Sequence, residues 1–104
     1  MVRFTKEEIA TTFKAARRVL KHPGLDILKA PTQGVGKLLV VTPRHTGNAV
    51  HRNRIRRRLK AIFYEEKLGN RGYNCIVIVK KESNTLSFDD LKALLIQAFS
   101  HATP

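Results

Sequence analysis

The sequence predicts an α/β fold of the α+β kind, a two-layer sandwich of helices on a central mixed sheet, forming a single domain over residues 1–104. Three observations predict it. Apolar residues make up 42% of the chain and recur at helical spacing near both ends, behind helix-capping residues. Short runs rich in Val, Ile and Leu lie between them and indicate strands. A chain of 104 residues can bury one modest core but not two.

The first element is a helix expected over residues 5–20, with the sequence TKEEIATTFKAARRVL. Thr5 and Glu8 have the spacing of a capping box, and apolar residues follow them at helical intervals. This apolar stripe consists of Ile9, Phe13, Ala16 and Leu20. The helix should stop at His-Pro-Gly, residues 22–24, because proline cannot continue a helix.

Three strand candidates follow along the chain. Residues 25–30 (LDILKA) form a short one, and residues 37–43 (KLLVVTP) form a stronger one, with the turn PTQGVG between them. Residues 73–81 (YNCIVIVKK) contain an almost unbroken apolar run, which is typical of a strand covered on both faces. We therefore expect this last strand to lie centrally in the sheet.

Two further helices complete the order α-β-β-(β)-α-β-α, in which one additional strand is optional. A basic helix is expected at roughly residues 48–67, with cap chemistry in the loop 46–48 and an end near GNRG at 69–72. The last helix begins with Ser87 and Asp90 at cap spacing. Its apolar stripe consists of Leu91, Leu94, Leu95, Ala98 and Phe99.

The charge balance points to a polyanionic partner. Twenty Lys and Arg residues against eight Asp and Glu give a formal net charge of +12 and a pI near 10.6. No apolar run is long enough to span a bilayer, and the N-terminal residues are too polar for a signal peptide, so we expect a cytoplasmic protein without a membrane partner. The single cysteine, Cys75, excludes an intramolecular disulfide and a cysteine-based zinc site.

The basic helix has two faces. Its apolar face, which should pack on the sheet, consists of Ile55, Leu59, Ile62 and Phe63. The residues that should project away from this face are Asn53, Arg54, Arg56, Arg57 and Lys60, while Arg52 and Arg58 should flank it on opposite sides. The helix therefore holds its cations in defined directions.

The cations of this helix have no acidic neighbours in the sequence. Like charges at i+3 or i+4, such as Arg54 and Arg57, cost on the order of 0.2–0.5 kcal/mol per pair, and no acidic residue occurs between Asp26 and Glu65. A solvated charged face is the alternative interpretation, but a surface selected for solubility would mix signs. We infer that an external polyanion completes this face. The excess of arginine, whose planar fork grips phosphate, favours RNA.

The segment GNAVHRNRIRRRLKAIF, residues 47–63, resembles the signature of the bacterial ribonuclease P protein component, a Gly-x-Ala-x-x-Arg-Asn-Arg core followed by further basic residues. The core residues in this chain are Gly47, Ala49, Arg52, Asn53 and Arg54. The resemblance covers most of the chain and implies an α/β sandwich with an unusual left-handed strand-helix-strand crossover. It also implies a protein subunit that binds a catalytic RNA and the 5′ leader of precursor tRNA. In such enzymes the RNA performs the Mg²⁺-dependent cleavage that matures the tRNA 5′ end.

The resemblance also assigns roles by position. The residues that would contact the catalytic RNA are Arg44, Arg52, Asn53, Arg54, Arg56, Arg57, Arg58 and Lys60. The leader would run along a cleft between the first helix and the sheet, lined by Ile9, Phe13 and Arg17, with Phe13 as the stacking residue. Mg²⁺ would be bound mainly by the RNA, any metal ligand on the protein is left unassigned, and no obligate protein partner is implied. The chain departs from the family pattern at Ile9, where relatives often carry an aromatic residue, and at Arg44 and His45, where they carry a lysine pair.

Other functions stay open on the sequence alone. The main alternative is a ribosomal or other RNA-binding scaffold protein, and a weaker one is a DNA-binding module, because the basic helix lacks a helix-turn-helix context. His45 and His51 raise the question of a protein nuclease, but they have no acidic partner or metal-ligand cluster nearby in the sequence. We therefore expect the polypeptide itself to be non-catalytic.

Overall fold

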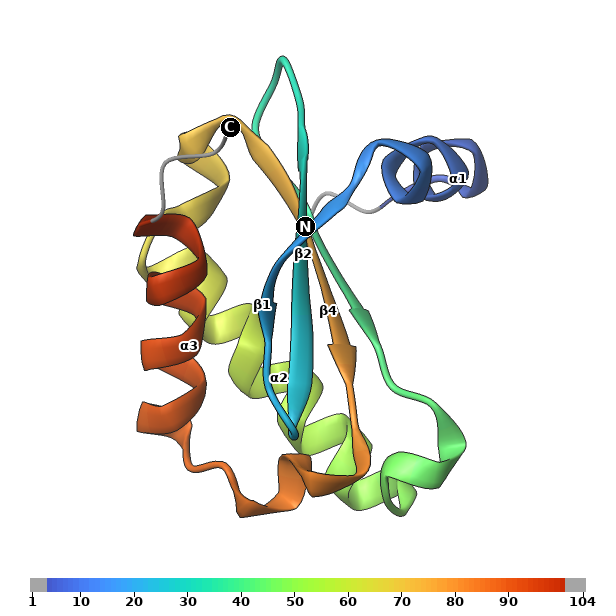
Figure 1. The fold of residues 1–104 in the computed structure, drawn as a ribbon, viewed down its shortest axis with the longest axis vertical. Helices are drawn as coiled ribbons and strands as arrows, with labels where there is room; N and C mark the ends of the chain where they lie inside the picture. Colours follow the sequence, from blue (N-terminus) through green and yellow to red (C-terminus); the bar gives the residue numbers. More distant parts are fainter. Residues whose placement is uncertain (1–3, 101–104) are drawn as a thin grey trace.

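The computed structural model describes residues 4–100, which form a mixed four-stranded sheet with helices on both of its faces (Figure 1). The helices and strands are α1 (Lys6–Ala15), β1 (Arg17–Lys21), β2 (Leu25–Pro31), β3 (Leu38–Val41), α2 (Ala49–Glu65), β4 (Tyr73–Val79) and α3 (Phe88–Ser100). Three 3-10 turns join them, η1 (Arg44–Thr46), η2 (Leu68–Arg71) and η3 (Lys81–Thr85). The predicted α+β sandwich is confirmed, and β1 is an additional strand that lies where the end of the first helix was predicted.

The strand order is β1-β2-β4-β3, which makes β4 internal, as its apolar run predicted. β1 pairs with β2, and β2 with β4, in antiparallel fashion. β3 and β4 are parallel, in a register that runs from Leu38 opposite Cys75 to Val41 opposite Ile78. α2 connects these two parallel strands, which confirms the strand-helix-strand unit; its left-handed sense stays a prediction.

The main core lies between one face of the sheet and the helices α2 and α3. Alternate residues of β2 and β4 point into it, for example Leu25, Ile27, Cys75 and Val77, each with no exposed surface. The predicted apolar face of α2 is fully confirmed, and in α3 the predicted stripe is buried except for the partly buried Leu94. Burial of each such aliphatic or aromatic side chain contributes about 1.5–3 kcal/mol, so this layer holds α2 in one orientation.

The first helix is shorter than the sequence predicts. The capping box of Thr5 and Glu8 is present, but the helix ends at Ala15, and Ala16 already has extended backbone angles. The rest of the expected helix is β1, which pairs with β2 across the hairpin at residues 22–24. Leu20 is buried as predicted, but it packs from this strand and not from a helix. These residues have helical spacing, but the segment forms a strand because β2 offers an edge for backbone hydrogen bonds.

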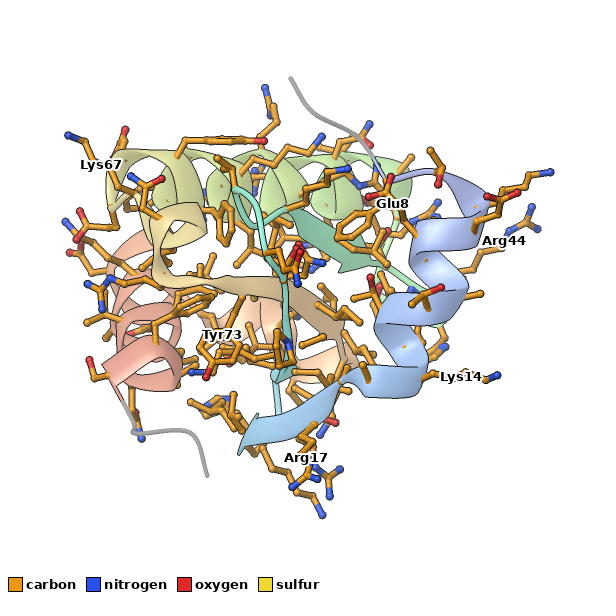
Figure 2. All side chains as sticks on the ribbon, turned by 90° about the horizontal axis from the view of Figure 1, so that it is seen from above. Glu8, Lys14, Arg17, Arg44, Lys67 and Tyr73 are labelled. Carbon is orange, nitrogen blue, oxygen red and sulfur yellow. The ribbon has the colours of Figure 1, made fainter. Side chains whose placement is uncertain are left out.

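α1 lies on the sheet face opposite α3, as Figure 2 shows from above. Thr12 is its only buried residue, and Ala30 and Ile76 are buried on this face outside the main core. A salt bridge of 2.6 Å between Lys37 Nζ and Glu8 Oε2 fastens α1 to the segment before β3. The hydrogen bond from Lys37 is also the main cause that lowers the pKa of Glu8. α1 is therefore held by a few contacts at one end of a sheet face that it covers only in part.

The connection between β2 and β3 passes close to the start of β4. The backbone N–H of Gly36 donates to the carbonyl oxygen of Gly69 at 2.7 Å. A Cβ atom at position 36 would lie 1.9 Å from the carbonyl oxygen of Tyr73, so only glycine fits there. This glycine lets the loop pack against η2 and β4 without displacing β3.

Candidate nucleic-acid interface

Two residues determine where the basic helix α2 begins. Asn48 is its N-cap, and the Asn48 side-chain oxygen accepts a hydrogen bond of 2.8 Å from the backbone N–H of His51. Gly47 has a φ of 150°, and a Cβ atom there would lie 2.6 Å from Cδ2 of His51. The Gly-Asn pair of the sequence motif is thus a structural requirement for starting α2 at this point.

The outward face of α2 carries its cations without acidic partners. Asn53, Arg54 and Arg57 are exposed as predicted, and Lys60 is half-buried. Within residues 4–100 the ion pairs are Arg18–Asp26, Lys80–Asp26, Lys37–Glu8 and Lys92–Glu66, and none of them includes a cation of α2. The like charges therefore repel one another with no internal compensation.

Arg56 differs from the prediction that it projects away from the fold. Its Nη2 donates a hydrogen bond of 2.5 Å to the hydroxyl oxygen of Thr42, just after β3, and Nη1 donates to the Asn53 side-chain oxygen at 3.4 Å. The guanidinium is therefore docked against the end of β3 and half-buried. An arginine held in this way loses little side-chain entropy when it meets a phosphate.

Arg52 and Arg58 flank the apolar face of α2, as predicted, and both are half-buried. The Nε of Arg52 is buried and has no hydrogen-bond partner among the described residues. Leaving a buried donor unpaired costs about 1–3 kcal/mol. Arg44 is exposed in η1, beyond the N-terminal end of α2 and at the opposite end from Lys67 (Figure 2).

Two shallow grooves run along α2 and meet at Arg57. One is lined by Val50, Asn53, Arg56, Arg57 and Lys60. The other, toward α3, is lined by Arg54, Arg57, Arg58, Ala61 and Phe88. Both grooves are cationic and neither has a carboxylate in its lining. Their chemistry suits the phosphates of a nucleic-acid backbone, with guanidinium groups as bidentate donors.

None of the predicted leader-cleft residues lines the groove between α1 and β2. This groove is lined by Thr5, Glu7, Glu8, Thr11, Thr12, Ala15, Ala30, Pro31, Thr32 and Asn74. Ile9 and Phe13 are absent from it, since they lie on the other flank of α1, where Ile9 is half-buried and Phe13 is 41% exposed. The carboxylates of Glu7 and Glu8 make the first groove unsuited to a polyanion.

Arg17 is not where the sequence suggested. It begins β1 and pairs with Lys29, and paired residues in neighbouring strands point to the same face. The Nζ of Lys29 lies 5.0 Å from the ring centre of Phe99 in α3, on the core side of the sheet. The structure therefore places Arg17 on the α3 side of the sheet and not on α1, because the chain has already crossed from helix to strand at that residue. Its contact with the leader stays a prediction.

Several contacts of the interface could not be found from the sequence. Thr42 holds Arg56 across 14 residues of chain, and Ser83 contacts His51 across 32. Neither residue stands out in composition or spacing.

Among residues 4–100 no group of three or more His, Cys, Asp or Glu side chains is placed to hold a metal ion. Burial raises the pKa of the Cys75 thiol to about 12, so this cysteine stays protonated and unreactive.

Within the described part of the chain, no helix combines the length and the apolar character that crossing a membrane requires.

Comparison with known proteins gives a consistent result for the fold and the family. The family model described as Ribonuclease P matches residues 4–103. Comparison with curated protein sequences gave no match.

Solved structures with a similar fold include the ribonuclease P protein from Thermotoga maritima, with a TM-score of 0.79, 20% identity and full coverage of both chains. The same Thermotoga protein in complex with 1-(4-fluorophenyl)-2-thiourea has a TM-score of 0.77 at 21% identity, covering 94% of this chain and 96% of that one. The ribonuclease P protein from Staphylococcus aureus has a TM-score of 0.74 at 16% identity, covering 92% of this chain and 89% of that one.

Proposed function

Because the chain belongs to the ribonuclease P protein family, we propose that it binds the catalytic RNA of a cytoplasmic ribonucleoprotein and assists its cleavage of precursor tRNA without cleaving RNA itself. A role in tRNA 5′ processing follows from the family and disfavours the scaffold and DNA-binding alternatives. The observation that supports the RNA-binding role most directly is the outward face of α2, whose cations have no carboxylate partner among the described residues.

α2 would bind the catalytic RNA by replacing counterions along the RNA backbone. Arg57 stands between two cationic grooves, and Arg56 is already oriented by Thr42. The apolar side of the helix is buried in the core, so its cations keep their positions when RNA binds. This preorganisation lowers the entropic cost of the complex.

The 5′ leader would run over the partly open sheet face beside α1, on the flank that carries Ile9 and Phe13. Leu28, Leu39 and Ile78 are half-exposed there and offer an apolar floor for bases. The one acidic residue of the strands on this face, Asp26, is neutralised by Lys80 at 2.8 Å and by Arg18 at 3.7 Å. The opposite flank of α1 is lined by Glu7 and Glu8, which would repel the leader phosphates.

Mg²⁺ would be held by the RNA, where it supplies the hydrolytic chemistry. Four of the eight acidic residues, Glu8, Asp26, Glu66 and Asp90, have partners among the described residues. Glu8 binds Lys37, Asp26 binds Lys80, and Asp90 accepts from the backbone N–H of Ser87 at 3.0 Å. The protein's part is then to raise the affinity of the complex for its substrate.

Reconstitution tests this proposal. The purified protein alone should leave precursor tRNA uncut, because residues 4–100 hold no cluster of three or more His, Cys, Asp or Glu side chains that could bind a catalytic metal ion. Added to the cognate catalytic RNA at low Mg²⁺, it should increase 5′ cleavage. The increase should be larger for a substrate with a leader of several nucleotides than for one whose leader is a single nucleotide. Cleavage by the protein alone, or no change on its addition to the RNA, would contradict the proposal.

Phe13→Ala tests the leader path. Loss of a stacking ring costs about 1–3 kcal/mol per base, so affinity for leader-bearing precursor tRNA should fall by about tenfold. Affinity for mature tRNA and the midpoint of urea unfolding should change little, because Phe13 is 41% exposed. The matched control is Ile96→Ala, which removes a similarly exposed apolar side chain from α3, on the other side of the sheet. Equal losses in the two variants would contradict this leader path.

A further inference from the structure

A small pocket lies between α2 and η3, and it shares Arg54 and Arg58 with the groove that runs toward α3. Its volume is about 50 Å³, and its polar lining consists of His51, Arg54, Arg58, Ser83 and Asn84. The rest of its lining is apolar, from Ile55, Leu86 and Leu91. Arg54 and Arg58 come from successive turns of α2, whereas Ser83 and Asn84 come from η3, after β4. The tertiary fold thus places Arg54 and Arg58 of α2 beside the polar residues Ser83 and Asn84 of η3.

The polar groups of this pocket are mostly hydrogen-bond donors. The two guanidinium groups can only donate, and the Asn84 amide and Ser83 hydroxyl can each donate as well. No carboxylate is part of the lining. Arg54 and Arg58, four residues apart, repel each other, and neither has an ion pair within the described residues. An anion with several acceptor oxygens would satisfy all of these groups together.

His51 holds the η3 side of the pocket in place. Its Nε2 lies 3.0 Å from the hydroxyl oxygen of Ser83, which is only 1% exposed. The backbone of Ser83 is also bonded on both sides, since its N–H donates to the carbonyl of Lys80 and its carbonyl accepts from the N–H of Leu86. The Ser83 hydroxyl is therefore positioned before any ligand arrives.

We propose that this pocket is a phosphate-binding site in which Ser83 and Asn84 of η3, together with Arg54 and Arg58 of α2, hold one phosphate group of the RNA backbone. Its volume of about 50 Å³ suits a small anionic group such as a phosphate. The RNA contact surface would then extend from the basic helix onto the connection between β4 and α3. The assignment of a phosphate ligand follows from the side chains of the pocket. Only the assignment of that phosphate to RNA rests on the proposed function.

The first experiment uses the protein without RNA and inorganic phosphate as the probe. Phosphate should produce saturable NMR shifts at the backbone amides of Ser83 and Asn84, compared with chloride at equal ionic strength. Shifts that match those of chloride, or that do not saturate, would overturn the phosphate site. This result does not depend on whether the protein functions with a catalytic RNA.

The second experiment measures affinity for the catalytic RNA in Asn84→Asp and in the control Asn70→Asp. Both asparagines are exposed in 3-10 turns, so both variants should fold and both lose the same net charge. A carboxylate in the pocket would repel the bound phosphate, and we expect about five- to tenfold weaker binding for Asn84→Asp against about twofold or less for Asn70→Asp. Equal effects would overturn RNA as the source of the phosphate, while the family function would stand if Arg57→Ala still weakened binding.

Discussion

Arg54→Ala combined with Arg57→Ala should weaken binding of the catalytic RNA by about tenfold per arginine and leave the fold intact. Hydrogen bonds to charged groups contribute about 1.5–3 kcal/mol each, and both side chains are exposed on the face of α2 that has no internal counterions. The slope of log affinity against log salt should flatten by about 0.7–0.9 for each lost phosphate contact. Filter binding over a range of salt concentrations measures both quantities.

The same double variant should unfold at an equal or slightly higher urea concentration than the parent protein. It removes like-charge pairs from α2, and alanine has the highest helix propensity. Lys67→Ala combined with Arg71→Ala is the matched control, because it removes two exposed cations beyond the C-terminal end of α2. If this control weakened RNA binding as much, net charge alone would explain the affinity, and the face of α2 would have no special role.

Leu59→Ala should have the largest effect on folding, lowering the free energy of unfolding by about 2–5 kcal/mol. Leu59 has no exposed surface and lies in the core between α2, α3 and the sheet. Domains of this size are stabilised by only about 5–15 kcal/mol in total, so the loss should be evident in urea unfolding. Wherever the variant is still folded, its affinity for RNA should stay close to that of the parent protein.

Val50→Ala is the control for this effect, since it removes apolar atoms from the same helix at a position that is 64% exposed. Its free energy of unfolding should change by no more than about 0.5 kcal/mol. Two results together would contradict the division of α2 into a packing face and a binding face. One is loss of RNA binding by a folded Leu59→Ala protein, and the other is loss of stability in the Arg54→Ala, Arg57→Ala double variant.

The two faces of α2 could be predicted because helical periodicity is a local property. Ile55, Leu59 and Ile62 recur at intervals that place them on one side of any helix, and the structure buries all three. The caps at Thr5, Asn48 and Ser87 could be predicted for the same reason, since each side chain accepts a hydrogen bond from the backbone N–H three residues later.

The stretch after Ala15 could not be predicted in the same way. Ala16 and Leu20 fit a helical stripe, yet this stretch is extended because β2 supplies a ladder of backbone hydrogen bonds. The choice between helix and strand there depends on a partner strand that sequence periodicity does not reveal. The same change moved Arg17 away from the flank of α1 where Ile9 and Phe13 lie.

The sequence by itself determined that this protein has one core and a capped basic helix with two faces, and it predicted a polyanionic partner, because these follow from composition and from contacts within a few residues. Only the tertiary structure decided that Arg56 docks on Thr42, that α1 leaves part of one sheet face open, and that His51 meets Ser83 beside Arg54 and Arg58. Those arrangements join residues far apart in the chain. They are set by strand pairing and core packing, which bring distant side chains together only when the whole domain has folded.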